Sequence, residues 1–383
     1  SLETAKPVSL TLPLRKEAYV SGVLFPFFDG LIPEGWLLDV ALRNTDISAL
    51  DRMSLLLACC KDCVGAVSVV AEKTMANCLH CYRPLLKGEQ DMHPACCKKF
   101  FGTTTLPVLD YTTKHLDQLA LQIIQDQTSL TGVQPKLSLH LEAHEGSKRL
   151  TIVGFFGNYI CKPQTEQYEM TPEVEDLTMH LAEVARIEVV PHTLMRMADD
   201  TLCYLTRRVD RTPTGEKIAM EDMCQLTERK TEDKYKSSYE RIGKAILNYS
   251  SLPKMDVTNF FELVLFSWLV GNNDMHLKNF SLYETATGMR LTPAYDLLNA
   301  VIINPKDAEE LALTLNGRKR KLQREDFVEL AATLGIERVV VERLINRYRG
   351  LLPRFEPVIQ NSFLGADLKE KYSALLQERL GRI

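Results

Sequence analysis

The hydrophobic pattern changes character along the chain. Between residues 130 and 211, short apolar runs bounded by turn residues predict strands; these are Lys136–Leu141, Leu150–Phe155, Tyr159–Lys162 and Cys203–Val209. A helix is predicted between them at Pro172–Arg186, because its apolar residues follow helical spacing. From Met255 onward helices dominate. They begin with the nearly all-apolar Val257–Val270 and continue through a periodic stretch, Arg324–Leu380, that is interrupted by Gly335, Gly350–Pro353 and Gly365.

The first 70 residues give a different pattern, in which short apolar runs alternate with turn signals at Phe25–Gly30 and Cys63–Val67. This pattern predicts a small α+β unit. We therefore expect an α+β fold in four parts, made of an N-terminal subdomain (1–72), a Cys-rich insert (73–105), a mixed α/β lobe (106–211) and a mainly helical lobe (212–383).

Composition narrows the class of protein. The 383 residues are 45% hydrophobic and 25% charged, and no apolar run approaches the length of a membrane span, so we expect a protein that does not contact membranes. The net charge of −4 excludes a global attraction to nucleic acid or acidic lipid. The ten cysteines are mostly scattered among apolar neighbours, which favours reduced thiols and a cytoplasmic location. Because the chain opens on Ser1 without Met or a targeting segment, we expect native residues upstream.

One segment carries the residues that phosphoryl transfer needs. Asp274 and Asn279 are five positions apart after the predicted buried helix, and Asp296 follows a predicted hairpin formed by Phe280–Tyr283 and Met289–Leu291. Protein kinases use this spacing for a catalytic carboxylate, a metal-binding Asn and a second metal-binding Asp. The pattern predicts that Asp274 orients the acceptor hydroxyl or accepts its proton, while Asn279 and Asp296 bind Mg²⁺.

Each of these residues has a simpler explanation, because Asn and Asp commonly cap helices and turns. Two further residues favour the kinase interpretation. Lys162 ends a predicted strand and Glu175 lies on the helix that follows, which is the order of the Lys–Glu ion pair that holds ATP phosphates in kinases. A lone strand Lys is usually solvated, so this assignment depends on the whole set.

The Cys-rich insert has the ligand spacing of a metal site. Cys78 and Cys81 form one pair of ligands, and His93 and Cys96 form a second pair that can close a tetrahedron around zinc. Cys97 is an alternative to Cys96 as the fourth ligand. The simpler explanation of the whole pattern is that reduced cysteines and a surface histidine coincide by chance. A segment of about 25 residues with few aliphatic side chains needs a bound metal or a similar cross-link to stay folded. We therefore predict structural zinc with four protein ligands.

Two segments resemble a known family. Ser129–Lys136 is similar to the phosphate loop of HipA-like toxin kinases, and Asn273–Ser281 is similar to their catalytic segment. The resemblance extends to Phe27–Glu34, Asp62–Val67 and Glu221–Gln225, so it covers nearly the whole chain except the Cys-rich insert.

The resemblance implies a two-lobed protein-kinase-like fold and an ATP- and Mg²⁺-dependent serine/threonine kinase that acts as the toxin of a toxin–antitoxin system. It implies phosphorylation of an aminoacyl-tRNA synthetase, a helix-turn-helix antitoxin as partner and indirect contact with operator DNA. The implied ATP-binding residues are Gly132, Val133, Gln134, Lys136, Lys162, Glu175, Gln225, His276 and Lys278. Ser129 would be a site of autophosphorylation, and Arg207 departs from a glutamate that some members carry at the adenine hinge.

A rival interpretation is a catalytically weak kinase-fold module that mainly binds an antitoxin or operator DNA. The intact Asp274, Asn279, Asp296 and Lys162 argue against it. The basic run Arg318–Lys321 is compatible with contacts to DNA phosphates, although such runs are more often solvated loops.

Overall fold

The computed structural model describes residues 7–15, 19–44, 47–60, 67, 69, 77–113, 115, 136–144, 147–153, 157–165 and 167–383. The chain forms two compact units, Ser1–Met75 and Ala76–Ile383. None of the helices in the described part of the chain is both long and apolar enough to cross a membrane.

The described part of the first unit is built from three short helices. They are α1 (Pro26–Asp29), α2 (Trp36–Asn44) and α3 (Arg52–Cys59). The turn predicted at Phe25–Gly30 is a single helical turn, started by a proline at its first position. Ile32, Leu55 and Leu56 form a small core, and Arg52 joins α3 to α1 through a 2.6 Å ion pair with Asp29. Most of the turn predicted at Cys63–Val67 lies outside the described residues.

The second unit contains a five-stranded antiparallel sheet in the order β2-β1-β3-β5-β4. Its strands are β1 (Leu137–His144), β2 (Ser147–Ile152), β3 (Tyr159–Pro163), β4 (His192–Arg196) and β5 (Leu202–Arg207). Four of them were predicted, with ends that differ by up to three residues. Strand β4, which forms one edge of the sheet, was not predicted.

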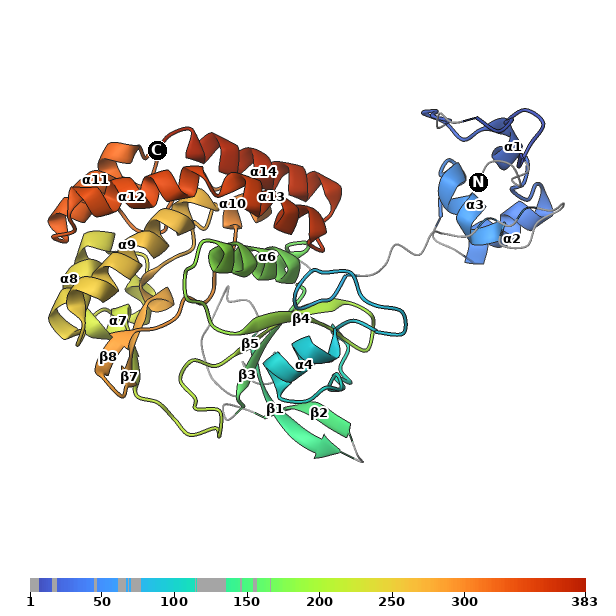
Figure 1. The fold of residues 1–383 in the computed structure, drawn as a ribbon. Helices are drawn as coiled ribbons and strands as arrows, with labels where there is room; N and C mark the ends of the chain where they lie inside the picture. Colours follow the sequence, from blue (N-terminus) through green and yellow to red (C-terminus); the bar gives the residue numbers. More distant parts are fainter. Residues whose placement is uncertain are drawn as a thin grey trace. The chain divides into compact units, whose positions relative to one another are not determined.

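The sheet has two covered faces (Figure 1). Helix α6 (Thr171–Val184) packs on β4 and β5 on one face, where Tyr204 joins the same core as Val174 and Leu177. The Cys-rich segment with α4 (Pro94–Phe101) packs on the opposite face, where Phe100 and Phe101 share a core with Tyr159, Cys161 and Leu205. Since side chains alternate along a strand, β5 can contribute to both cores.

Helices and a small sheet make up the rest of the unit. The three-stranded antiparallel sheet β6-β7-β8 consists of β6 (Met220–Asp222), β7 (Ser281–Thr285) and β8 (Gly288–Leu291). The helices and short 3₁₀ turns are α7 (Met223–Leu226), η1 (Thr231–Asp233), α8 (Tyr239–Tyr249), α9 (Pro253–Leu269), η2 (Leu277–Asn279), α10 (Ala300–Ile303), α11 (Arg324–Thr333), α12 (Arg338–Arg349), α13 (Leu352–Asn361) and α14 (Ala366–Leu380). The glycines and proline that interrupt the periodic C-terminal stretch lie between these last helices or at the start of one.

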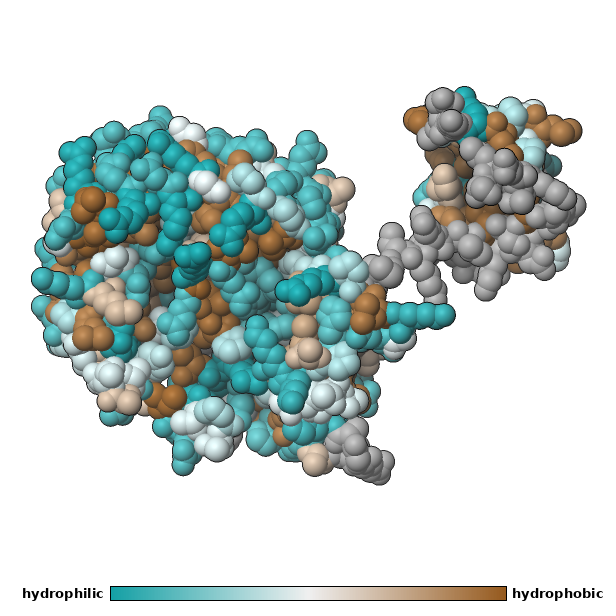
Figure 2. Space-filling model, viewed as in Figure 1, coloured by the Kyte–Doolittle hydropathy of each residue, from teal (hydrophilic) through white to brown (hydrophobic). Residues whose placement is uncertain are grey.

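Helix α9 passes through the centre of this helical part. Its residues Phe260, Phe261, Val264, Phe266 and Trp268 are fully buried, as the nearly all-apolar pattern predicted. Hydrophilic residues cover most of the visible face of this unit in Figure 2, which is consistent with burial of its large aromatic side chains.

Candidate active site

A cavity of about 740 Å³ collects most of the residues predicted for phosphoryl transfer. Its lining comes from the large sheet, α6, the small sheet and the loop after α9. The predicted residues among those that line it are Lys136, Lys162, Glu175, Gln225, Asp274, His276, Lys278, Asn279 and Asp296. The predicted Ser129, Gly132, Val133 and Gln134 lie outside the described residues.

An ion-pair network lies at one side of this cavity. The Lys162 Nζ atom is 2.5 Å from Glu175 Oε1 and also contacts Asp296 Oδ1, while Lys136 Nζ is 2.8 Å from Asp296 Oδ2. Lys162 and Glu175 are buried, with 3% and 1% of their surface exposed. These contacts join a strand and the helix that follows it to a loop more than 100 residues further along the chain.

The pKa shifts agree with charged Lys162 and Asp296 side chains, while burial raises the pKa of Glu175 to about 7. Burial raises the pKa of the Asp296 carboxyl, but the ammonium groups of Lys136 and Lys162 outweigh burial and hold that pKa well below its usual range. Burial lowers the pKa of Lys162, but Asp296 and Glu175 together raise it above its usual value. Asp296 is therefore a carboxylate and Lys162 an ammonium ion at neutral pH.

The local sequence explains why Lys162 and Glu175 meet. Lys162 pairs with Tyr204 of β5 in the register of the sheet, so both side chains face α6. Helix α6 starts with Pro172 at an N-terminal position and buries Val174 and Leu177 against the core. That orientation directs Glu175, on the same part of the helix, toward the lysine.

The loop after α9 is fixed by its own hydrogen bonds. Gly271 adopts a left-handed φ of +78° directly after the helix, and Asn273 Nδ2 donates to the Glu309 carbonyl at 3.0 Å. Asn279 Nδ2 donates to the Asp274 carbonyl at 3.2 Å. This contact uses the amide nitrogen of Asn279, so its amide oxygen is the atom that can face a cation.

Tyr235 is a site residue that sequence reasoning missed. Its hydroxyl donates to Asp274 Oδ1 at 2.6 Å, and its ring meets the His276 ring edge-on at 5.0 Å between centroids. Burial, and then the neighbouring Asp274 carboxylate, raise the pKa of Tyr235, so the phenol stays protonated. Tyr235 lies in a loop without a motif, and nothing in its sequence context signals this contact.

Other predicted residues are held by structural contacts at the cavity wall. Lys278 Nζ is 2.5 Å from Asp222 Oδ2, and Gln225 accepts from the Asp222 backbone N–H at 2.8 Å in the capping box of α7. Burial lowers the pKa of His276 to about 4, so its imidazole is neutral at neutral pH. Within the described part of the chain, its buried Nδ1 atom has no hydrogen-bond partner.

The arrangement provides oxygen ligands for Mg²⁺ and positive charge for phosphate groups, which a Mg²⁺-bound polyphosphate requires. Carboxylate and amide oxygens at Asp296 and Asn279 are the hard ligands that Mg²⁺ prefers. Lys136 and Lys162 supply positive charge beside them. The donor set therefore fits a magnesium nucleotide.

Comparison with known proteins places the chain in a family. The model of the HipA-like C-terminal domain matches residues 128–353, and the model of the HipA N-terminal domain matches residues 1–70. The first of these covers more than half of the chain. The chain belongs to the HipA-like family.

Curated relatives of this HipA-like chain carry kinase names. It is 28% identical to the "Putative kinase Y4mE" of Sinorhizobium fredii over 80% of this chain and 72% of that protein. It is 25% identical to the serine/threonine-protein kinase toxin HipA of Shewanella oneidensis over 76% of this chain and 66% of the relative. The family resemblance predicted from Ser129–Lys136 and Asn273–Ser281 is confirmed, and kinase activity is supported at the family level.

A solved structure supports the fold of this HipA-like chain. A chain in the Shewanella oneidensis MR-1 complex of HipA, HipB and operator DNA superimposes with a TM-score of 0.55 at 21% identity. The match covers 93% of this chain and 83% of that chain. The mixed α/β architecture is therefore shared over most of the molecule.

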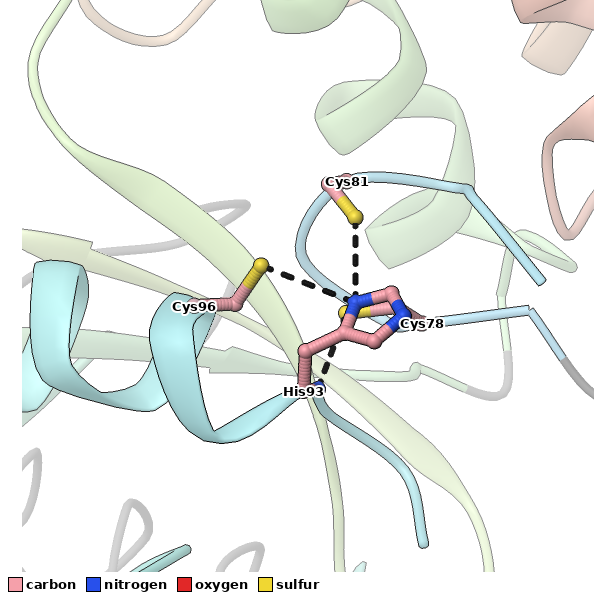
Figure 3. Close-up of side chains that lie close together, drawn as sticks. All are labelled: Cys78, Cys81, His93 and Cys96. Carbon is pink, nitrogen blue, oxygen red and sulfur yellow. Dashed lines mark hydrogen bonds between the residues drawn. The ribbon is translucent and has the colours of Figure 1, made fainter. Parts of the chain in front are cut away.

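The four predicted zinc ligands lie together in the HipA-like chain (Figure 3), with their ligand atoms all within 4.8 Å of one another. His93 Nδ1 is 3.4 Å from Cys81 Sγ and 3.8 Å from Cys96 Sγ. Bond lengths of about 2.3 Å to sulfur and about 2.1 Å to nitrogen at tetrahedral angles give an S–N separation of roughly 3.6 Å. The spacing therefore suits a tetrahedral ion, and in the described cluster Cys96, rather than Cys97, completes the set.

The surroundings of His93 also suit a metal ligand. Its Nε2–H donates to the Pro84 carbonyl at 3.1 Å, which leaves Nδ1 as the basic nitrogen facing the thiols. The His93 backbone N–H points to Cys78 Sγ at 3.5 Å. These are the outer hydrogen bonds expected around a His and a Cys that bind a metal.

Arg207, which departs from the hinge glutamate of some family members, contacts the Cys-rich segment. Its guanidinium donates to the Phe100 carbonyl and lies over the Phe100 ring, 5.5 Å from the ring centroid. The basic run Arg318–Lys321 lies in a loop, where Lys319 pairs with Glu309 at 3.1 Å and Arg318 reaches Asp326 at 3.7 Å.

Proposed function

We propose that this chain is an ATP- and Mg²⁺-dependent serine/threonine protein kinase with a two-lobed kinase-like fold. The observation that carries the proposal is the convergence of Lys162, Glu175 and Asp296 in one ion network on the cavity that Asp274 and Asn279 also line. A capping role for each carboxylate alone does not account for this convergence. The large sheet with α6 would form one lobe and the helical part the other.

Each residue has a role in this proposal. Lys162 and Lys136 bind phosphate oxygens, and Glu175 holds Lys162 in place. Asn279 and Asp296 would hold Mg²⁺, which when bound offsets the negative charge of the phosphates. Asp274 orients the acceptor hydroxyl or accepts its proton. His276, Lys278 and Gln225 line the nucleotide site, while Gly132, Val133 and Gln134 would cover the phosphates by family resemblance.

The biological role is proposed from the family. We infer that the chain is the toxin of a toxin–antitoxin system in the cytoplasm, with a helix-turn-helix antitoxin as partner and indirect contact with operator DNA. The solved Shewanella oneidensis complex, which contains HipA, HipB and operator DNA, supports this proposal. The proposed substrate class is aminoacyl-tRNA synthetases, and Ser129 is the proposed autophosphorylation site.

The Cys-rich segment is proposed to hold structural zinc. Cys78, Cys81, His93 and Cys96 provide four protein ligands, which leaves no open position for a substrate on the ion. The segment also shares a core with the sheet through Phe100 and Phe101, so the metal is not its sole source of stability.

Nucleotide binding by calorimetry, with and without Mg²⁺, tests the proposed function. The wild-type chain should bind ATP, and Mg²⁺ should tighten binding at least about tenfold. Asp296→Ala should lose that Mg²⁺ dependence, whereas Asp367→Ala, which removes a carboxylate whose side chain is 72% exposed, should retain it. Absence of ATP binding to the wild-type chain would contradict the proposal and favour the rival, a module that only binds an antitoxin.

A further inference from the structure

The Cys-rich segment wraps around the β4 edge of the large sheet and contacts the helix that carries Glu175. The Leu79 carbonyl accepts from the Leu194 backbone N–H of β4 at 3.3 Å. Arg196 of the same strand pairs with Asp91 at 3.0 Å, next to the second pair of zinc ligands. The edge strand is thus covered by the turn that holds Cys78 and Cys81.

Tyr82 reaches from this turn to helix α6. Its hydroxyl donates to Asp176 Oδ2 at 2.7 Å, and its ring stacks on His180, 4.3 Å between centroids. His180 Nε2 is 2.8 Å from the His80 carbonyl. Tyr82 is 3% exposed, so these contacts are buried.

Asp176 is the centre of this contact and directly follows Glu175. The carboxylate is completely buried and accepts hydrogen bonds from Tyr82 of the turn and from His192 of β4 at 2.7 Å. His180 Nδ1 lies 3.4 Å from the carboxylate and donates to the Asp176 backbone carbonyl at 2.9 Å. Adjacent helix residues point about 100° apart, so Glu175 can face the cavity while Asp176 faces the turn. The ligand atoms of Asp176, His180 and His192 are near enough together for a metal, but hydrogen bonds from His192 and Tyr82 already occupy both carboxylate oxygens of Asp176.

The turn also contacts the helical part of the unit. Asn77 Nδ2 donates to the Asn361 carbonyl at 3.0 Å, and Tyr82 meets the Phe363 ring edge-on at 5.5 Å. The turn therefore lies where the sheet, α6 and the end of α13 come together.

We propose that zinc at Cys78, Cys81, His93 and Cys96 controls nucleotide binding by holding the Tyr82 turn against α6. The turn contains two of the four ligands, and Tyr82 directly follows Cys81. Loss of the ion frees this turn, removes the Tyr82 hydrogen bond from Asp176 and loosens the helix that positions Glu175 beside Lys162. The proposal rests on the proposed function, because the Lys162–Glu175 pair is taken to hold ATP phosphates.

The first test compares full-length zinc-loaded protein with the same protein after its zinc has been removed by a zinc-selective chelator and desalting. Portions of the stripped protein are then supplied with Zn²⁺ or with Mg²⁺ alone. We expect about one zinc per chain by elemental analysis. Stripping should speed amide hydrogen exchange in α6 and weaken ATP binding about tenfold. Zn²⁺ should restore both properties, and Mg²⁺ alone should restore neither. Zinc-free purified protein, or stripped protein with unchanged α6 exchange and ATP affinity, overturns the proposal.

The second test leaves the ligands intact. Tyr82→Phe should keep its zinc but weaken ATP binding several-fold, because it removes the hydrogen bond to Asp176. Tyr348→Phe is the matched control, since this buried tyrosine donates to Glu262 at 3.1 Å in the helical part. Equal ATP affinity in the two variants would show that the Tyr82 hydrogen bond does not link the zinc site to nucleotide binding. If zinc-loaded wild-type protein binds no ATP, the proposed function is contradicted. Amide hydrogen exchange in α6, measured without nucleotide, then still tests whether zinc holds the Tyr82 turn against this helix.

Discussion

In the proposed mechanism, the hydrogen bond between Tyr235 and Asp274 competes with the hydroxyl of the protein acceptor. The phenol donates to Asp274 Oδ1 at 2.6 Å, and a serine or threonine hydroxyl would need to donate to the same carboxylate. The proposed catalytic residue is therefore paired with Tyr235.

Replacement of this tyrosine should favour the acceptor. We predict that Tyr235→Phe lowers the KM for a protein acceptor about threefold and leaves ATP affinity unchanged, because the acceptor no longer competes with a neutral hydrogen bond. Tyr249→Phe, at a residue that is 54% exposed, serves as the control in the same steady-state kinetics. A large fall in kcat for Tyr235→Phe would show instead that the phenol assists the reaction.

Ser129 is predicted to be an inhibitory phosphorylation site. A phosphate adds close to two negative charges, and by family resemblance it would lie beside the loop that includes Lys136, where it would compete with ATP phosphates. Incubation with Mg²⁺ and ATP should add phosphate at Ser129 and abolish ATP binding, as measured by peptide mapping and calorimetry. Ser129→Ala should keep its ATP affinity. Phosphate found only at other residues would refute the prediction.

At the scale of elements, Gly271 determines how α9 leads into the loop that contains Asp274. A Cβ atom there would lie 2.5 Å from Asn299 Oδ1 and 2.6 Å from Leu375 Cδ2, in a backbone with φ of +78°. Both the left-handed backbone and the close neighbours require glycine.

Two alanine variants separate these effects. Gly271→Ala should lower the free energy of unfolding by about 3 kcal/mol, because it combines backbone strain with a steric clash. Gly335→Ala shares the left-handed backbone, with φ of +68°, but no atom lies within 4 Å of its added Cβ, so about 1 kcal/mol is expected. Urea unfolding of both variants measures the difference, and equal losses would mean that the clash relaxes at no cost.

The sequence predicted elements well where strong local signals exist. The predicted breaks at Gly335 and Gly365 lie between C-terminal helices of the structure. The apolar run Val257–Val270 predicted a buried helix, and its large side chains are buried. Strand β4 was missed because it begins after Pro191 and lacks apolar alternation, and its place depends on pairing with β5 and contact with Leu79. The local sequence carries little signal for a strand whose position depends on such tertiary contacts.

For the candidate site, the sequence predicted residues that lie together but not all of their contacts. Motif spacing and chain order identified Lys162, Glu175, Asp274, Asn279 and Asp296, which all line the same cavity. The contact of Tyr235 with Asp274 joins two loops and follows no periodicity. Asp176 and His180 had a usable signal, because residues four apart on a predicted helix share a face, but their partners Tyr82 and His192 come from other elements.

At the scale of the whole molecule, the large sheet of the second unit connects two sites of different chemistry. One face presents Lys162 to Glu175 and Asp296, and the other shares a core with the Cys-rich segment that holds the four proposed zinc ligands. The Tyr82 turn at the β4 edge joins them through Asp176. Nucleotide binding and metal binding are therefore expected to be coupled within this unit.

Phosphoproteomics after induced expression of the full chain tests the central claim most directly, because it detects phosphorylated proteins whatever the identity of the substrate. The comparison is wild type against Asp274→Ala, with calorimetry confirming that the variant still binds ATP within about threefold of wild type, as expected when only acceptor positioning is lost. The account predicts serine or threonine phosphosites on host proteins that appear with the wild-type chain and are nearly absent with Asp274→Ala. The same phosphosites at similar abundance in both cultures would contradict it.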